Sequence, residues 1–283
     1  MLKKLLKYDL RTTGRFVWII ALFTLLICAF DGILLRASLE MLQGGNAVLA
    51  VIGMIAFCLG MVSVSMTLPL ALLLMFYRFY RHLYTDIGYL AFTLPVSRKQ
   101  ILASKTLSAI FWTLIQLLVI GIGTAFILFC APPAADGVYF NSIVYVKLAA
   151  LVREVWNGIG AWTVVYAIEI LAIMLLGIWI TVGFAQMCIT VGATVFKKRK
   201  LVASVVIYMV ASAFVVSVVD IFASVSTVLL ADGFIDVLSV SNGTIQLVSF
   251  AIILLIACVI LASVAVFMHL VTLDRIERKL SLA

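Results

Sequence analysis

Charged residues are scarce in this chain of 283 residues, because Asp, Glu, Lys and Arg together make up only 11% of it. A soluble domain of this size normally carries about 25% charged residues, since its surface faces water. Hydrophobic residues make up 66%, and several apolar runs exceed the roughly 18 residues that mark a membrane-spanning helix. We therefore predict an all-α membrane protein with a single transmembrane domain over residues 1–283. A membrane β-barrel is excluded, because its strands would alternate apolar and polar residues.

The chain also lacks the short motifs that carry common chemistries. No G-x-x-x-x-G-K-[ST] sequence is present to cradle a nucleotide phosphate, and neither H-E-x-x-H nor G-x-S-x-G occurs. The five cysteines lie inside apolar runs without a C-x-x-C spacing, so they are interpreted as small buried residues. We therefore expect that this chain is not an enzyme, has no catalytic or metal-binding residues, and binds no cofactor itself.

Basic residues outnumber acidic ones, and their distribution indicates membrane topology. The net charge is +8, yet the basic residues stand in short clusters beside apolar runs, which does not favour a nucleic-acid partner. Of the 20 Lys and Arg residues, 17 lie in the N-terminal segment, the 77–105 loop, "KKRK" at 197–200 and the C-terminal tail. Only Arg36, Lys147 and Arg153 fall on the other side. By the positive-inside rule, both termini are predicted to be cytoplasmic.

Six apolar runs are long enough to cross a lipid bilayer. They cover roughly 16–36, 48–76, 106–131, 158–194, 201–222 and 245–272. The fourth run would be about 55 Å long as a helix, whereas the apolar core of a bilayer is about 30 Å thick. It must therefore either project beyond the bilayer or break, with Gly160, Gly177, Gly183 and Gly192 as candidate break points.

Three further segments have patterns of their own. Residues 1–15 place leucines on one helical face and most basic residues away from it, which is typical of an amphipathic helix in the membrane interface. A basic topogenic flank that is merely helical would give the same pattern. Residues 141–156 predict a second interfacial helix on the outer side. Residues 220–238 are apolar but too short to cross twice, so they predict a pair of short helices that is either re-entrant or interfacial.

The polar stretch between the second and third spans predicts a short helix of its own. Pro95 disfavours helix at the residue before it, so a helix over 85–94 should end near Thr93. Ser97 resembles an N-cap with Gln100 three residues later, which predicts that the next helix begins at Arg98. The short helix would lie on the cytoplasmic side.

The helical period gives this segment two faces. Leu83, Ile87, Leu90 and Leu94 fall on one side, where they can rest on the membrane-embedded body. The other side carries Thr85, Tyr89 and Phe92, with Asp86 and Thr93 at its edge. Exposed aromatic side chains on a short helix are typical of a protein–protein contact. An aromatic belt at the level of the lipid headgroups is the alternative, and helical geometry does not decide between them.

The stretch "TDIGYLAFTLPVSRKQILASK" resembles a known sequence, the cytoplasmic loop between the second and third spans of ABC transporter permeases of the type-2 exporter class. The start "MLKKLLKYDLRTTGRF" resembles the start of a Gram-positive group of these permeases. The matching positions are Asp86, Gly88, Tyr89, Leu90, Leu94, Pro95, Val96, Ser97, Lys99, Ile101, Leu102, Ser104 and Lys105. The loop match covers about 20 residues, and the six-span layout extends it with lower specificity.

The resemblance implies a function. The chain would be the membrane permease subunit of an ATP-driven exporter in the bacterial cytoplasmic membrane, and a separate ABC ATPase subunit would hydrolyse the ATP. The helix over 85–94 would be the coupling helix, with Tyr89 and Phe92 as the main contacts to that ATPase. Residues 1–15 would be the elbow helix, and 220–238 the family's re-entrant pair. A homodimer or a pair with a second permease is expected.

Acidic residues in or near the spans are candidates for a role in substrate passage or gating, since a charge in lipid is costly. They are Asp31, Glu169 and Asp220, all toward the outer half. A role in helix pairing at the outer interface is the alternative for each. Two other functions also remain open for the chain as a whole. One is a secondary transporter that works alone, and the other is a membrane sensor or assembly protein that uses the same loop to bind a partner.

Overall fold

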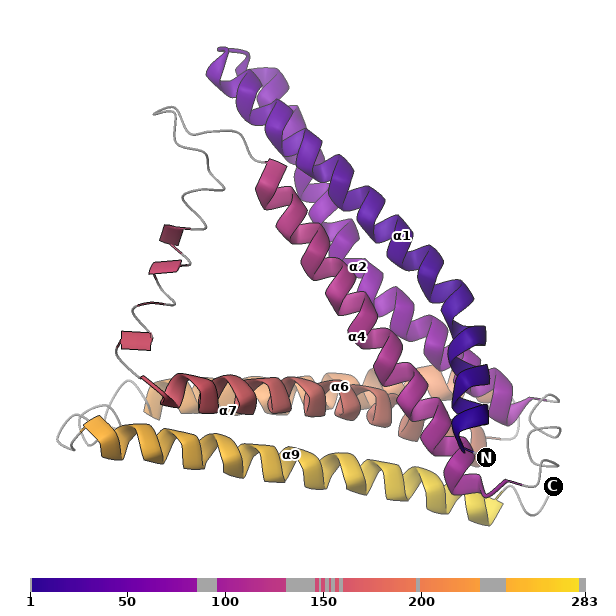
Figure 1. Cartoon of the computed structure of the whole chain (residues 1–283). Coiled ribbons are helices and arrows are strands. Elements are labelled where there is room, and N and C mark those ends of the chain that lie inside the picture. The colour runs from indigo at the N-terminus through magenta and orange to yellow at the C-terminus, as the bar shows by residue number, and fades with distance from the viewer. Residues whose placement is uncertain are drawn as a thin grey trace. The chain divides into compact units, whose positions relative to one another are not determined.

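The computed structural model describes residues 2–85, 96–130, 146–147, 149–150, 153, 156–157, 160–196, 199–229 and 243–279. Its long helices are α1 (Leu2–Gln43), α2 (Ala47–Tyr84), α4 (Arg98–Cys130), α6 (Trp162–Val195), α7 (Lys200–Leu229) and α9 (Gly243–Lys279) (Figure 1). All 6 are long and apolar enough to cross a membrane. Within these described ranges, the prediction of an all-α fold with six helices of membrane-spanning length is therefore confirmed.

The first span and the segment before it form one helix. Helix α1 runs from Leu2 to Gln43, so residues 1–15 are not set apart as a helix of their own. The faces follow the predicted pattern, with Lys3 and Lys7 exposed and Leu6 partly buried. Whether this end of α1 lies flat in the membrane interface stays a prediction.

The long fourth run is continuous. Helix α6 has 34 residues and passes through Gly177, Gly183 and Gly192. Its length is about 51 Å, so it projects beyond an apolar core of about 30 Å, the first of the two alternatives. Gly160, the remaining candidate break point, precedes the helix and has a φ of 61°, which favours glycine.

Three predicted segments fall wholly or partly outside the described residues. Residues 86–95, which hold most of the predicted coupling helix, lie outside them, as do most of residues 141–156. Within 220–238, residues 220–229 continue helix α7, and residues 230–238 lie outside the described residues. The coupling helix and the re-entrant pair therefore stay predictions.

The chain forms two compact units. The first contains Met1–Tyr77 and Ala103–Gly158, and the second contains Arg78–Leu102 and Ile159–Ala283. Helices α2 and α4 are divided between the units. Consequently the described residues on both sides of the loop 86–95, 78–85 and 96–102, belong to the second unit, although most of α2 and α4 belongs to the first.

In the first unit, α1 packs against both α2 and α4 through small residues. A Cβ on Gly123 of α4 would lie 2.5 Å from Cys28 Sγ of α1, and one on Gly53 of α2 would lie 2.8 Å from Ser38 Cβ. Near its N-terminus, α1 brings Trp18 to Trp112 of α4 in an edge-on contact with ring centroids 6.2 Å apart. The order of these contacts along the chain makes α1 parallel to α4, whereas α2 is antiparallel to α1.

In the second unit, α6 packs against both α7 and α9. A Cβ on Gly192 would lie 2.5 Å from the Cα of Ser204, so the backbones of α6 and α7 approach each other closely there. The Ser204 hydroxyl donates to the Ile189 carbonyl of α6 at 3.2 Å. Farther along the pair, Phe184 lies against Tyr208 with ring centroids 5.8 Å apart, which makes the two helices antiparallel.

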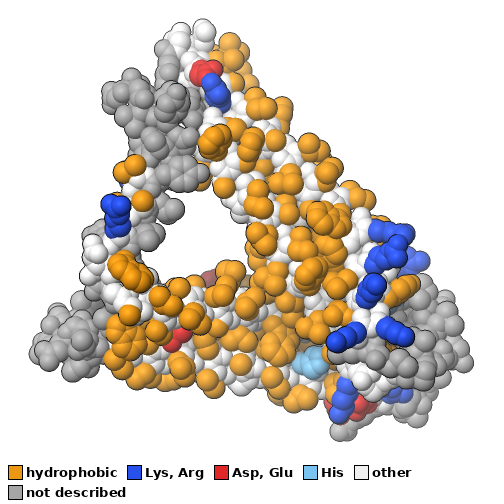
Figure 2. All heavy atoms as spheres, in the orientation of Figure 1, with side chains coloured by type: hydrophobic (Ala, Val, Ile, Leu, Met, Phe, Trp, Pro, Cys, Tyr) orange, Lys and Arg blue, Asp and Glu red, His pale blue; other side chains and the backbone are white. Residues whose placement is uncertain are grey.

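Apolar side chains cover the outer surfaces of these helices. Figure 2 shows hydrophobic side chains along their middle stretches and Lys and Arg side chains toward helix ends. Ile52 is 57% exposed on α2, and Phe214 is 70% exposed on α7. Such surfaces are stable in contact with lipid, where exposed apolar groups cost nothing.

The close approach of α6 and α7 predicts opposite effects for two glycines of α6. Gly192→Ala should lower the stability of the purified protein, because the new methyl group meets backbone atoms of Ser204 that cannot rotate away. Gly177→Ala should leave it unchanged or raise it by up to about 1 kcal/mol, because nothing lies within 4 Å and alanine favours helix. Thermal unfolding in detergent measures both. Equal losses for the two variants would contradict the described packing.

Candidate functional site at the flanks of the 86–95 loop

The predicted partner-binding residues lie mostly beyond the described part of the chain. Asp86, Tyr89 and Phe92 are outside it, so their contact with an ATPase stays a prediction. Thr85 is described, directly after the end of α2. Its hydroxyl donates to the Arg81 carbonyl at 2.5 Å, which satisfies a carbonyl in the last turn of that helix.

The flank that precedes the loop is bonded to α6. The Tyr84 hydroxyl, at the last residue of α2, donates to Thr190 Oγ1 at 2.8 Å. Thr190 is fully buried, and its own hydroxyl donates to the Gln186 carbonyl of α6 at 2.8 Å. Tyr84 is also in ring contact with Phe79 and Tyr80 of α2, with centroids 6.3 Å and 6.1 Å apart. The end of α2 is therefore held to α6 by a hydrogen bond whose acceptor, Thr190 Oγ1, is buried.

The flank that follows the loop is bonded to α9. Arg98, the first residue of α4, donates from its Nη1 to the carbonyls of Ile276 and Glu277, at 3.2 Å and 2.9 Å. These carbonyls belong to the last turn of α9, where no intrahelical donor remains for them. A cation at this end also interacts favourably with the helix dipole. Arg98 therefore acts as a C-terminal cap for a different helix.

Ser97 sets the position of Arg98. The Ser97 carbonyl accepts hydrogen bonds from the backbone N–H groups of Gln100 at 2.9 Å and Ile101 at 3.2 Å. Ser97 thus occupies the N-cap position and α4 begins at Arg98, which confirms the predicted start of this helix. Because the helix starts there, Arg98 is fixed in its first turn.

These contacts attach both flanks of the loop to other helices. One flank is bonded to α6 and the other to α9, and all of these residues belong to the same unit. A displacement of the loop would therefore act on the ends of α6 and α9. The sequence did not reveal this, because Tyr84 and Thr190 are 106 positions apart and Arg98 and Ile276 are 178 apart.

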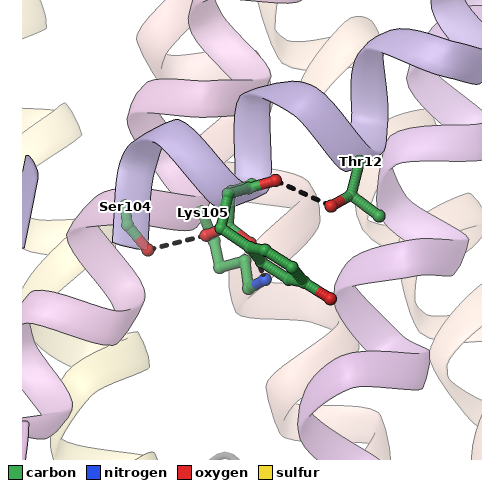
Figure 3. Close-up of polar contacts among 5 residues, drawn as sticks. Thr12, Ser104 and Lys105 are labelled. Carbon is green, nitrogen blue, oxygen red and sulfur yellow. Dashed lines mark hydrogen bonds and ion pairs between the residues drawn. The ribbon is translucent and has the colours of Figure 1, made fainter. Parts of the chain in front are cut away.

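The last two residues of the loop motif, Ser104 and Lys105, hold the N-terminal segment. Ser104 Oγ donates to Asp9 Oδ2 at 2.8 Å, and Lys105 Nζ forms an ion pair with Asp9 Oδ1 (Figure 3). Asp9 is 5% exposed and Ser104 is fully buried. On α1, the Thr12 hydroxyl donates to the Tyr8 carbonyl at 2.7 Å, beside this cluster. The start of α1 is thereby fixed to α4 within the first unit.

Asp9 was not singled out from the sequence, although a signal was present. It is the one acidic residue in a segment that contains five basic residues. Gln116, a lone amide in an apolar run, gave a similar signal. Its Nε2 donates to Thr24 Oγ1 at 3.0 Å and to Thr67 Oγ1 at 3.3 Å, so it links α4 to α1 and α2. Both polar residues join helices.

The three acidic candidates differ in burial and surroundings. Asp31 belongs to the first unit, is 1% exposed and lies against Gly60 of α2. Glu169 is partly buried on α6, where its Oε2 is buried without a hydrogen-bond partner among the described residues. Asp220 is exposed on α7. In the described part of the chain, no three His, Cys, Asp or Glu side chains are grouped as a metal ion would require.

The Asp9–Lys105 pair predicts a strong difference between single and double substitutions. Asp9→Asn should destabilise the protein by about 2–3 kcal/mol, because it leaves the largely buried Lys105 ammonium without its counter-ion. The double variant Asp9→Asn/Lys105→Met should be less destabilised than Asp9→Asn alone, and Lys7→Ala on the exposed face should be near neutral. Thermal unfolding in detergent gives all three values. A double variant that is as unstable as Asp9→Asn alone, or more so, would exclude a coupled pair.

The Arg98 contact predicts a local effect at the end of α9. Arg98→Ala should increase hydrogen exchange over residues 272–279, because two terminal carbonyls lose a charged donor, at a cost of about 2 kcal/mol. Lys99→Ala removes the same charge from the neighbouring exposed position and should leave this exchange unchanged. Exchange is read by mass spectrometry on the purified protein. Identical profiles for the two variants would show that the charge, and not the contact, matters.

Comparisons with known proteins add no relative to these observations. No protein-family model, no curated protein and no solved structure matches this chain.

Proposed function

We propose that this chain is the membrane-spanning permease subunit of an ABC exporter in the bacterial cytoplasmic membrane. A separate ATPase subunit binds the loop 86–95 and drives transport, since this chain has no phosphate-binding loop of its own. The observation that carries the proposal is the attachment of both loop flanks, through Tyr84 to α6 and through Arg98 to α9. The motif resemblance supports it, because the same stretch contains the loop and the flanking Arg98.

In the proposed mechanism, a displacement of the loop is passed on to membrane-spanning helices. When the ATPase subunit closes on ATP, it displaces the loop, with Tyr89 and Phe92 as the main contacts and Asp86 and Thr85 at their edge. The flanks pass this displacement to the ends of α6 and α9, because side chains at both points are bonded to those helices. Packed helices move as rigid bodies, so a shift at their ends changes access along their length.

The proposal includes the partners and the class of substrate. Two permease subunits, as a homodimer or with a second permease, enclose the transport route within the bilayer. The substrate is amphipathic or apolar, because few charged residues fall within the spans to bind a charged solute. The extensive apolar surfaces of the helices fit contact with lipid and with a second permease equally well.

The test begins with purification of the tagged chain from the membranes of its own host in a mild detergent. The co-purifying proteins are identified by mass spectrometry, and ATPase activity is measured in the same sample. A protein with a phosphate-binding loop should be retained together with activity. If none is retained with the unaltered chain, the proposal fails, and a transporter that works alone or a non-transporting membrane protein takes its place.

A second arm of the test concerns the predicted contact residues. Tyr89→Ala/Phe92→Ala should reduce the retained ATPase at least tenfold, because aromatic residues at the centre of an interface each contribute about 2 kcal/mol. The matched control is Tyr8→Ala/Phe196→Ala, which removes two exposed aromatic residues from segments also predicted to be cytoplasmic. Equal retention by both double variants would contradict the assignment of Tyr89 and Phe92, while the permease function would still stand.

A further inference from the structure

Asp31 of α1 is a buried ionisable side chain that the proposed function does not use. It is 1% exposed, and neither of its carboxyl oxygens has a hydrogen-bond partner among the described residues. Asp9 on the same helix is nearly as buried, but Lys105 and Ser104 bond to its two oxygens. An ion pair and a hydrogen bond therefore compensate the burial of Asp9, whereas the described residues offer Asp31 neither.

Asp31 lies against the backbone of a glycine and close to a cluster of buried apolar side chains. Its carboxyl group lies directly over the backbone of Gly60 on α2, where a Cβ would overlap the carboxyl atoms. One turn away on α1 and α2, Cys28 and Val64 form a buried cluster with Ile127 of α4. The carboxyl group thus occupies the space that a side chain at position 60 would fill.

No cation in these turns can balance a negative charge on Asp31. The turns that meet here, residues 27–35, 56–64 and 120–130, contain no Lys, Arg or His, and their other titratable groups are the thiols of Cys28, Cys58 and Cys130. The next basic residue along α1 is Arg36, whose side chain is 62% exposed and pairs with Glu40 at 2.9 Å.

An ionised carboxylate would be unstable in this position. It would lose its hydration, and the described residues offer it neither a counter-ion nor a hydrogen-bond donor in return, so the charged form is strongly disfavoured. The neutral acid is far less costly to bury, because only the desolvation of an uncharged polar group remains. The packed form of this contact therefore requires a proton on Asp31.

We propose that Asp31 is a proton-binding site whose neutral carboxyl holds α1 against Gly60 of α2, and whose ionisation opens this contact. The ligand is a proton and not a metal ion, because a metal ion needs several oxygen ligands and Asp31 is the one carboxylate in these turns. The proposal does not rest on the ATPase partner, and its test uses this chain alone.

The test compares the unaltered protein with Asp31→Asn, which keeps the shape of the side chain but has no proton to lose. The folded protein retains a proton that the unfolded chain releases above about pH 4. The contribution of Asp31 to the free energy of unfolding is therefore largest at low pH and is lost as the pH rises. Between pH 5 and 7, the folded-to-unfolded ratio of the unaltered protein should fall relative to Asp31→Asn by about tenfold per pH unit. Glu40→Gln, at an exposed carboxylate, is the control and should show no such trend.

Two results would overturn the proton site. A constant difference between the unaltered protein and Asp31→Asn across this pH range would mean that folding does not retain the proton. An advantage of the unaltered protein that grows with pH would mean that the fold stabilises the ionised form.

The opening of the contact has its own readout. At pH 9, amides of residues 57–64 should exchange several-fold faster in the unaltered protein than in Asp31→Asn measured at the same pH. At pH 5 the two proteins should exchange alike. Equal exchange at both pH values would show that Asp31 ionisation does not open the contact with Gly60.

Discussion

Helices in lipid have little reason to associate, and this constraint gives the few buried polar contacts of this chain their importance. The backbone groups of a membrane helix are already hydrogen-bonded within that helix, and its apolar surface gains nothing by leaving lipid. Association then depends on close packing of small residues and on hydrogen bonds between helices. In the first unit these are Gly123 against Cys28 and the Gln116 amide, and in the second unit Gly192 against Ser204.

The same constraint makes the division of α2 and α4 significant. Most of each helix packs with α1 in the first unit, whereas their ends beside the loop belong to the second. Tyr84 and Arg98 provide the polar contacts that attach these ends to α6 and α9. Two continuous helices, α2 and α4, therefore each belong in part to both units.

The fold was largely predictable because membrane-spanning helices leave strong local patterns. Long apolar runs gave all six helices, and Ser97 correctly indicated that α4 begins at Arg98. The extents of the helices were less predictable, since α1 also includes the segment before the first predicted span and α7 continues beyond residue 222, the predicted end of the fifth span. Glycines in the fourth run were ambiguous, because glycine permits both a break and close packing. Gly192 proved to be a packing residue.

The candidate site was predictable only in part, because its contacts join positions far apart in the sequence. The motif indicated the loop, but the periodicity of a segment cannot show that Arg98 caps α9 or that Tyr84 reaches Thr190. Acidic residues in apolar runs are recognisable as unusual from the sequence. Their burial is not, because it depends on which helices pack against them. Asp31 and Asp220 were therefore grouped together, although one is buried and the other exposed.

Under the proposed function, the loop acts on α6 and α9 through its two flanks. Hydrogen exchange tests this on the chain purified together with the proposed ATPase subunit, with and without ATP. We expect ATP to change exchange at the ends of α6 and α9, around residues 186–195 and 272–279. The double variant Tyr84→Phe/Arg98→Ala should lose this change while the complex still hydrolyses ATP. An ATP-dependent change that persists undiminished in the double variant would show that these flanks do not transmit the movement.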